Sequence, residues 1–289
     1  MISTSQIYHG IRGNKFKNLI KNILEKGNLK DKYISFLLND ENLQKYDQAF
    51  TAISANKEKN YEFYEQMGDL TINNFIVKYS YKRFPQLKCT EGVKVVARLR
   101  INYGSRQSFS DIADKLNIWD YISADEEERS RKKKDLLEDC LESFIGCTEY
   151  ILDEKYCQGV GYGIVYNILS NIFDNIQMSI DYDDLYDSKT RLKELFDIYS
   201  ILGKIEYIDS RTETLAISTI YRVPCGISNL PLKNNGINIP RKEWECLGYG
   251  HASKKSDAQQ KAAQESLKIL NKNGYVKEIP IEYLNFKKL

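Results

Sequence analysis

The sequence predicts a helical N-terminal domain followed by a smaller α+β domain. The chain has 289 residues, and domains of about 100–200 residues are usual, so two domains are expected. Apolar residues recur at helical spacing as far as residue 178. Beyond residue 203, three segments alternate apolar and polar side chains, as strands do, and a final helical pattern follows them. Only five prolines interrupt the chain, which favours a largely helical fold.

The elements of the first domain follow from periodicity and stop signals. We expect residues up to about 14 to be a loose leader. Pro85 ends the longest helical pattern, and the charge-dense segment at 124–134 is expected to be a solvated loop or helix start. An acidic segment, 178–188, is the candidate linker to the second domain. Helices are expected at residues 16–27, 31–40, 42–54, 60–84, 91–102, 108–116, 135–153 and 160–178.

Two of these helices carry acidic faces. Glu62, Glu65 and Asp69 are spaced i, i+3 and i+7 on the first, with no Lys or Arg between residues 60 and 77. This run alone is equally consistent with a solvated acidic face and with a metal or proton site. Asp139 and Glu142, at i and i+3 in a strongly apolar helix, shift the balance. Carboxylates from two helices that meet in an interior form a cluster suited to hard divalent cations.

The motifs that contain these acids resemble those of the ribonuclease III family. YEFYEQMGD at 61–69 is similar to the family's NERLEFLGD, and EDCLESFIGC at 138–147 is similar to ADxxEAxxGA. AFTAIS at 49–54 looks like the family's upstream ALTHxS. The resemblance implies an all-α endonuclease domain that dimerises. It also implies four metal-binding acids, with Glu62 in a supporting role: Glu65, Asp69, Asp139 and Glu142.

Some positions depart from the family pattern. Gln66 stands where relatives usually have a Phe that packs into the partner subunit, Tyr61 replaces the usual Asn, and Ala52 replaces the His of ALTHxS. None of these changes removes a predicted metal ligand. They leave open the details of the dimer contact and the hydrogen bonding of the site. Lys132 and Lys133 precede the second acidic motif, either as solvated charges or as phosphate contacts.

The second domain is predicted to have the order α-β-β-β-α. Its helices are expected at residues 189–199 and 254–272, and its strands at 204–210, 214–223 and 243–250. DSKTRLKEL and GHASKKSDAQQKAAQESL are similar to the two ends of the double-stranded RNA-binding domain, although the turn at 224–240 is longer than usual. Such modules recognise duplex shape, 2′-hydroxyls and phosphates. The implied RNA contacts are Lys189, Thr190, Glu194, Lys254 and Lys255.

We therefore predict an endonuclease domain at 16–180, a double-stranded RNA-binding domain at 186–273 and a tail at 274–289. The function expected from the resemblance is Mg²⁺-dependent cleavage of double-stranded RNA in RNA processing, with Mn²⁺ as a substitute. It implies two-metal hydrolysis that leaves 5′-phosphate and 3′-hydroxyl ends with short 3′ overhangs. The alternatives are a non-catalytic protein that sequesters duplexes and, less favoured, a helical metal hydrolase acting on small phosphates.

Composition limits the remaining possibilities. The net charge of +2 leaves nucleic-acid binding to local patches of charge. There is no apolar run long enough to span a membrane, and the N-terminus lacks a signal-peptide core, so a cytoplasmic location is expected. The homodimer is expected from the family resemblance alone. The six cysteines form no CxxC pair and are accompanied by two histidines, which argues against zinc and favours free thiols in a reducing compartment.

Overall fold

The computed structural model describes residues 6–223, 244–284 and 286. The turn at 224–240, singled out in the sequence, lies outside these residues. The chain divides into two compact units, Met1–Met178 and Ser179–Leu289, called here the N-terminal and C-terminal units. Each unit is described by itself.

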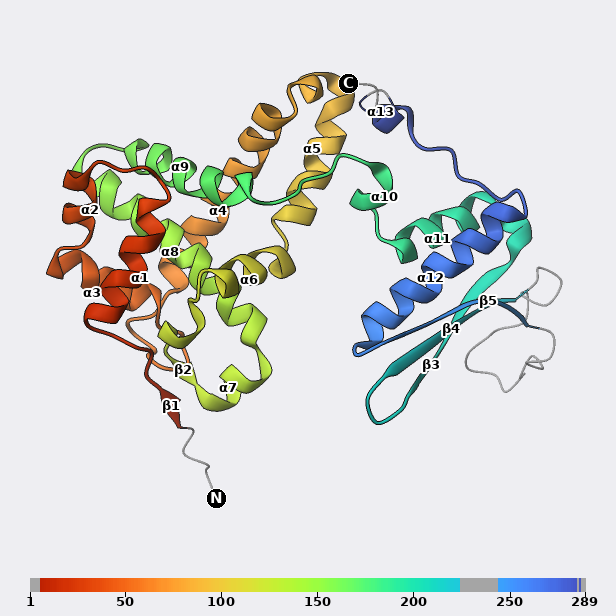
Figure 1. Ribbon diagram of the computed structural model, residues 1–289, viewed down its shortest axis with the longest axis horizontal. Helices are drawn as coiled ribbons and strands as arrows, with labels where there is room; N and C mark the ends of the chain where they lie inside the picture. The colour runs from red at the N-terminus through yellow and green to blue at the C-terminus, as the bar shows by residue number, and fades with distance from the viewer. Residues whose placement is uncertain (1–5, 224–243, 285, 287–289) are drawn as a thin grey trace. The chain divides into compact units, whose positions relative to one another are not determined.

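The described part of the N-terminal unit is built mainly from helices, with one short two-stranded sheet (Figure 1). The helical patterns in the sequence predict most of them, although the helices expected at 31–40 and 42–54 end earlier, at Leu37 and Ala49. The helices are α1 (Asn14–Glu25), α2 (Asp31–Leu37), α3 (Asp40–Ala49), α4 (Glu62–Arg83), α5 (Thr90–Tyr103), α6 (Arg106–Lys115), α7 (Glu126–Arg131), α8 (Lys133–Lys155) and α9 (Val160–Asp174), with 3-10 turns η1 (Pro85–Leu87) and η2 (Trp119–Tyr121).

Helix α8 is the central element of this unit. Its side chains are almost continuously buried from Leu136 to Leu152, and it contacts α3, α4, α6 and α9. Phe144 packs in its middle, stacked on Tyr46 with ring centroids 5.5 Å apart and edge-on to Phe50. A helix that is apolar on most sides belongs in a core, which explains why the two acids on α8 end up among buried residues.

Two glycines let α4 and α8 cross at very short range. A Cβ added to Gly68 of α4 would lie 1.9 Å from the carbonyl oxygen of Glu142, and one added to Gly146 of α8 would lie 2.1 Å from that of Tyr64. Any larger residue at either position would push the helices apart. The close crossing therefore depends on the glycines of the two acidic motifs.

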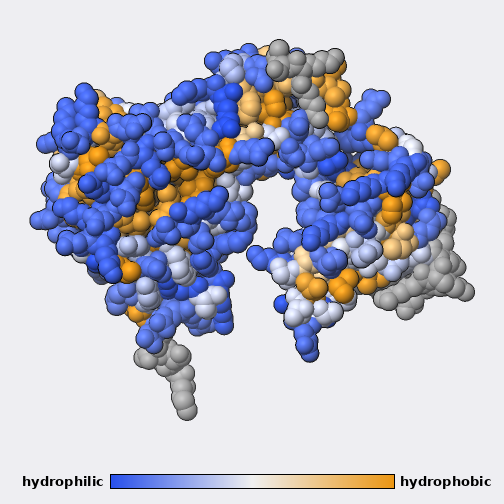
Figure 2. All heavy atoms as spheres, viewed as in Figure 1, coloured by the Kyte–Doolittle hydropathy of each residue, from blue (hydrophilic) through white to orange (hydrophobic). Residues whose placement is uncertain are grey.

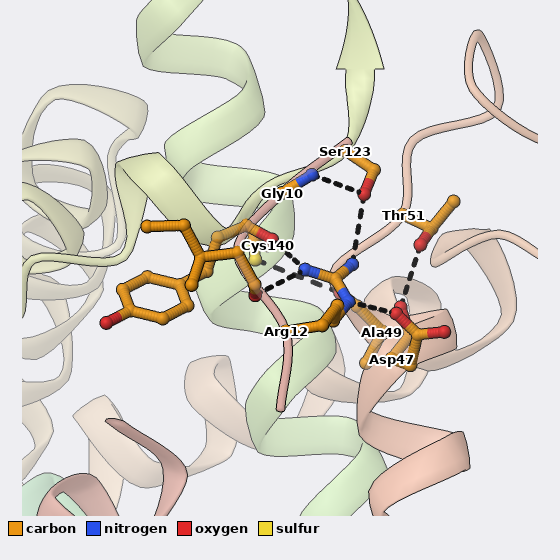
Figure 3. Close-up of polar contacts among 9 residues, drawn as sticks. Gly10, Arg12, Asp47, Ala49, Thr51, Ser123 and Cys140 are labelled. Atoms are coloured by element: carbon orange, nitrogen blue, oxygen red, sulfur yellow. Dashed lines mark hydrogen bonds and ion pairs between the residues drawn. The ribbon is translucent and has the colours of Figure 1, made fainter. Parts of the chain in front are cut away.

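The expectation of a loose leader is wrong for residues 7–12. Strand β1 (Ile7–Tyr8) pairs antiparallel with β2 (Ala124–Asp125). The guanidinium of Arg12 then donates to the carbonyl oxygen of Tyr121 at 2.6 Å and to Ser123 Oγ at 3.0 Å, and it pairs with Asp47 (Figure 3). These bonds to distant parts of the chain could not be read from local periodicity.

The charge-dense segment contributes β2 and α7. Asp125 caps α7, because its carboxylate accepts hydrogen bonds from the backbone N–H groups of Glu127 and Glu128. The basic residues that follow form ion pairs, Lys132 with Glu128 at 3.2 Å and Lys133 with Asp114 at 2.8 Å. Both lysines are exposed.

The C-terminal unit has a three-stranded antiparallel sheet in the order β3-β4-β5, with α12 packed against β4 and β5 and beside α11 (Figure 1). Leu192 and Phe196 of α11, Ile220 of β4 and Leu267 of α12 belong to its core. The elements are α10 (Tyr182–Leu185), α11 (Ser188–Ile198), η3 (Ser200–Leu202), β3 (Lys204–Arg211), β4 (Ala216–Val223), β5 (Glu245–Ala252), α12 (Lys255–Lys272) and α13 (Ile281–Leu284).

The candidate linker and the predicted tail meet in this unit. Helix α10 lies in the linker segment and α13 in the tail segment. Tyr283 of α13 is 2 % exposed, and its ring packs edge-on against Tyr182 of α10. Its hydroxyl lies 3.1 Å from that of Tyr186. Among the described residues, no helix has both the length and the apolar character needed to cross a bilayer.

Candidate active site

The acids predicted from the two motifs line one pocket of the N-terminal unit. The pocket has a volume of about 790 Å³. The acidic positions come from α4 and α8, and the rest of the wall includes the end of α5 and the start of α6. The lining residues are Glu62, Phe63, Glu65, Gln66, Asp69, Leu70, Gly104, Arg106, Glu138, Asp139 and Glu142.

The acids differ in how far they are withdrawn from water. Glu62 and Asp69 are exposed on α4, Glu65 and Asp139 are half-buried, and Glu142 of α8 is only 7 % exposed. The difference follows from the crossing of the helices, because Gly68 lies directly against the backbone of Glu142. With Glu138, which is also half-buried, the pocket thus has two carboxylates at its surface and four that are partly or largely removed from solvent.

Withdrawal from water raises the pKa of several of these carboxyls. Burial raises the pKa of Glu142 to about 8, and the charges of Asp69 and Glu138 add to the rise. Burial, followed by repulsion from Asp139, raises the pKa of Glu65 to about 7. The pKa of Asp139 rises to about 6, also mainly through burial. The site therefore holds part of its acid in the protonated form near neutral pH.

Hydrogen bonds fix two of the acids. The hydroxyl of Tyr61, the residue just before α4, donates to Asp139 Oδ2 at 2.9 Å. Burial and the neighbouring Asp139 carboxylate hold the pKa of Tyr61 well above its ordinary value, so the phenol stays a donor. The side-chain amide of Asn73, one turn along α4, donates to Asp69 Oδ1 at 2.8 Å.

Arg106 is a pocket residue that the sequence did not indicate. It opens α6, where Ser105 caps the helix, and its guanidinium lies 2.7 Å from Glu138 Oε2 and 2.9 Å from Asp135 Oδ1. It lies more than 30 residues from either motif along the chain, so its position in the sequence does not predict that it reaches the pocket. Its charge offsets acids at the rim of the pocket. Burial raises the pKa of Glu138 above its ordinary value, and the ion pair with Arg106 reduces that rise.

The donor set suits a hard divalent cation. Within residues 6–223, 244–284 and 286, no group of three or more acid, His or Cys side chains lies in a geometry ready to hold a metal ion. The carboxylates nevertheless share one pocket, where burial and then mutual repulsion raise the pKa of Glu65 and of Glu142. A bound cation would relieve both the repulsion and the burial of charge, and oxygen ligands are what Mg²⁺ prefers. The residues present therefore fit such an ion after side-chain adjustment.

In the C-terminal unit, two of the predicted RNA contacts are joined by a chain of polar side chains. Lys189 Nζ of α11 donates to Gln259 Oε1 at 2.7 Å, and the amide of Gln259 donates to Asp209 Oδ2 at 3.0 Å. Asp209 pairs in turn with Lys255 at 2.9 Å, beside the exposed Lys254. The sequence did not indicate Gln259 or Asp209, although both lie in predicted elements.

Thr190 and Glu194, the remaining predicted contacts, are hydrogen bonded to other groups. The hydroxyl of Thr190 donates to Asp187 Oδ2 at 2.7 Å. Glu194 Oε2 accepts hydrogen bonds from the hydroxyl of Tyr182 and from Lys277 Nζ, each at 2.8 Å. Lys277 belongs to the segment predicted as a tail. Glu194 is thus held by groups from α10 and from the segment after α12.

Comparison with known proteins adds independent information. The family model described as Ribonuclease III domain matches residues 62–150. A putative ribonuclease 3 of Invertebrate iridescent virus 6 is 40% identical over 98% of this chain and 96% of its own length. One from Frog virus 3 (isolate Goorha) is 35% identical over 89% of this chain, which spans 63% of that relative. The solved nuclease domain of Campylobacter jejuni ribonuclease III is 26% identical, with a TM-score of 0.41 over 50% of this chain and 95% of that domain.

Proposed function

This chain belongs to the ribonuclease III family and is a ribonuclease III endonuclease, and we propose that it cleaves double-stranded RNA at the pocket between α4 and α8. The observation that carries the proposal is the convergence of four acids, from two motifs about 70 residues apart, on one pocket. They are Glu65, Asp69, Asp139 and Glu142. A protein that only sequestered duplexes would have no need of this costly arrangement, since carboxylates repel one another when brought together.

These four acids are proposed to hold Mg²⁺, or Mn²⁺ as a substitute, with Glu62 in support. When bound, two such ions supply an activated water and Lewis-acid stabilisation of the attacking and leaving oxygens of a phosphodiester. The chain contributes by holding several carboxylates close together in one pocket, where a bound cation would relieve their repulsion. Asp139 accepts a hydrogen bond from Tyr61, and the backbone of Glu142 lies against Gly68.

The products follow from the proposed chemistry. Hydrolysis by a water that displaces the 3′ oxygen leaves a 5′-phosphate and a 3′-hydroxyl. Two staggered cuts leave short 3′ overhangs, as in the family that the sequence resembles.

The described cysteines are free thiols, which suits a reducing compartment, and we place RNA processing by this enzyme in the cytoplasm.

The C-terminal unit is proposed to be a double-stranded RNA-binding domain. Its element order from α11 to α12 and its three-stranded antiparallel sheet support this assignment. Lys254 and Lys255 lie at the start of α12, where the helix dipole adds to their charge and favours phosphate. Lys189 is connected to Lys255 through the side chains of Gln259 and Asp209. Thr190 and Glu194 are the proposed minor-groove contacts.

The N-terminal unit is proposed to form a homodimer. Phe63 and Leu70, on either side of the exposed Gln66 on α4, are 51 % and 67 % exposed. Val93 and Ile101 of α5 are 56 % and 54 % exposed, and hydrophobic residues are visible at the surface of α5 in Figure 2. Exposed apolar groups of this size are typical of interaction surfaces. Leu70→Glu should convert the dimer to a monomer in sedimentation analysis.

The function is tested by incubating the purified chain with an end-labelled RNA duplex, with the matching single strand, and with each in the presence and absence of Mg²⁺. We expect the duplex alone to be cut, and only with the metal. Binding of the duplex without cleavage under all metal conditions would favour a sequestering protein. Metal-independent cleavage would contradict the role assigned to the acids.

A further inference from the structure

A buried tyrosine hydroxyl is bonded directly to one of the pocket acids. Tyr61 is 4 % exposed and immediately precedes α4. Its backbone N–H donates to the carbonyl oxygen of Thr51 at 2.9 Å, so the residue is held at its main chain. Its hydroxyl reaches Asp139 Oδ2 on α8, 78 residues further along the chain, at 2.9 Å. The bond therefore ties the start of one acid-bearing helix to a carboxylate of the other.

We propose that Tyr61 is a positioning residue that orients the Asp139 carboxylate for cation binding. The inference rests on the proposed function, because it takes Asp139 to be a metal ligand. The hydrogen bond engages Oδ2 and restrains rotation of the carboxylate, whose remaining lone pairs would be available to a cation. Groups that hold a ligating carboxylate in this way commonly change metal affinity or activity by about 10- to 100-fold when they are removed.

The side chain at this position decides what can reach Asp139. An asparagine, which is usual here in the family that the sequence resembles, is shorter than tyrosine by most of a ring. It would not reach the same oxygen from the same backbone position. The tyrosine ring also fills a buried site, so its contribution to packing has to be separated from that of its hydroxyl.

Tyr61→Phe removes the hydroxyl and keeps the ring. The matched control is Tyr46→Phe. Tyr46 is fully buried, and its hydroxyl is hydrogen bonded to Thr148 Oγ1 at 3.0 Å, between α3 and α8. Each variant loses one buried phenolic hydrogen bond, but only Tyr61 bonds to a pocket acid. Melting temperatures of both variants without metal establish that both fold.

The decisive readout is Mn²⁺ and Mg²⁺ affinity of the full chain without RNA, measured by titration calorimetry. We expect Tyr61→Phe to weaken it by about 10- to 100-fold and Tyr46→Phe to leave it unchanged. In duplex cleavage, Tyr61→Phe should lower kcat at limiting metal without changing KM for RNA. Raising the metal concentration should restore its rate.

Unchanged metal affinity in Tyr61→Phe, or an equal loss in both variants, would overturn the inference. Asp139→Asn separates this result from a failure of the proposed function. If Asp139→Asn loses metal affinity while Tyr61→Phe keeps it, the positioning role alone fails. If Asp139→Asn also keeps wild-type affinity and cleavage, the metal assignment of Asp139 fails first.

Discussion

Replacing Glu142 with Gln should stabilise the metal-free protein while removing its activity. Glu142 is 7 % exposed, faces other acids and has a pKa raised by burial to about 8. The folded state therefore holds a proton at this site far more tightly than the unfolded chain does. The stability that this proton linkage provides is fully present below the ordinary carboxyl pKa of 4.5 and is lost as the pH rises through 8.

The size of the change in the free energy of unfolding follows from the raised pKa of Glu142. Between pH 4.5 and pH 7 the folded state loses about 1.4 kcal/mol per pH unit relative to the unfolded chain, or roughly 3 kcal/mol in total. A glutamine carries no charge but still buries a polar amide. We therefore expect Glu142→Gln to raise the free energy of unfolding by about 1–3 kcal/mol at pH 7 and above. That corresponds to a rise in Tm of roughly 3–9 °C for a unit of this size.

The assay is thermal unfolding in EDTA, followed by circular dichroism, at pH 5 and pH 8. The gain should be large at pH 8 and small at pH 5, where the folded wild type keeps the proton. Glu154→Gln serves as the control on the same helix, because the Glu154 side chain is 49 % exposed and pairs at the surface with Lys45. Its Tm should change by less than about 2 °C at either pH.

A Glu142→Gln protein that melts at or below the wild-type temperature at pH 8 would contradict this prediction. So would an equal gain at pH 5 and pH 8, because that gain could not come from proton linkage. Either result would mean that the Glu142 charge is not strained in the folded protein.

Three other predictions concern separate parts of the molecule. Mg²⁺ affinity should rise from pH 6 to pH 8.5 as Asp139, Glu65 and Glu142 lose protons, with pKa values of about 6, 7 and 8; calorimetry that finds pH-independent affinity would contradict it. Gly146→Ala should lower the free energy of unfolding in urea by about 1–3 kcal/mol, whereas Gly163→Ala, which meets nothing within 4 Å, should not lower it. Replacing Lys254 and Lys255 with Ala should weaken duplex binding and lower the slope of log K against log[salt] by about 1 per lysine; an unchanged slope would remove them from the RNA interface.

Local pattern was sufficient to predict most of the helices and which acids share a helix face. Glu65 and Asp69 share a face of α4 because of their spacing, and Asp139 and Glu142 share one of α8 for the same reason. The family motifs predicted that the two faces would meet. The order of the α-helices and strands from α11 to α12 was also predicted, because alternation and turn residues mark strands locally, whereas α13 in the predicted tail was not.

What the sequence did not predict depends on contacts between distant residues. The Arg12 network joins the N-terminal segment to Tyr121 and Ser123, over 100 residues away. Arg106 approaches Glu138 only because α6 packs against α8. The hydrogen bond from Tyr61 to Asp139 is of the same kind. Periodicity identifies the face on which a side chain lies, but not the partner that the folded chain brings to it.

We propose that the acid pocket cleaves RNA that the C-terminal unit binds. The most direct measurement compares wild type and Glu142→Gln on one labelled duplex in Mg²⁺, with binding and cleavage recorded in the same samples. We expect a Kd within about twofold of wild type, equivalent to about 0.4 kcal/mol, together with loss of cleavage. A variant that binds equally well and still cuts at the wild-type rate would contradict it.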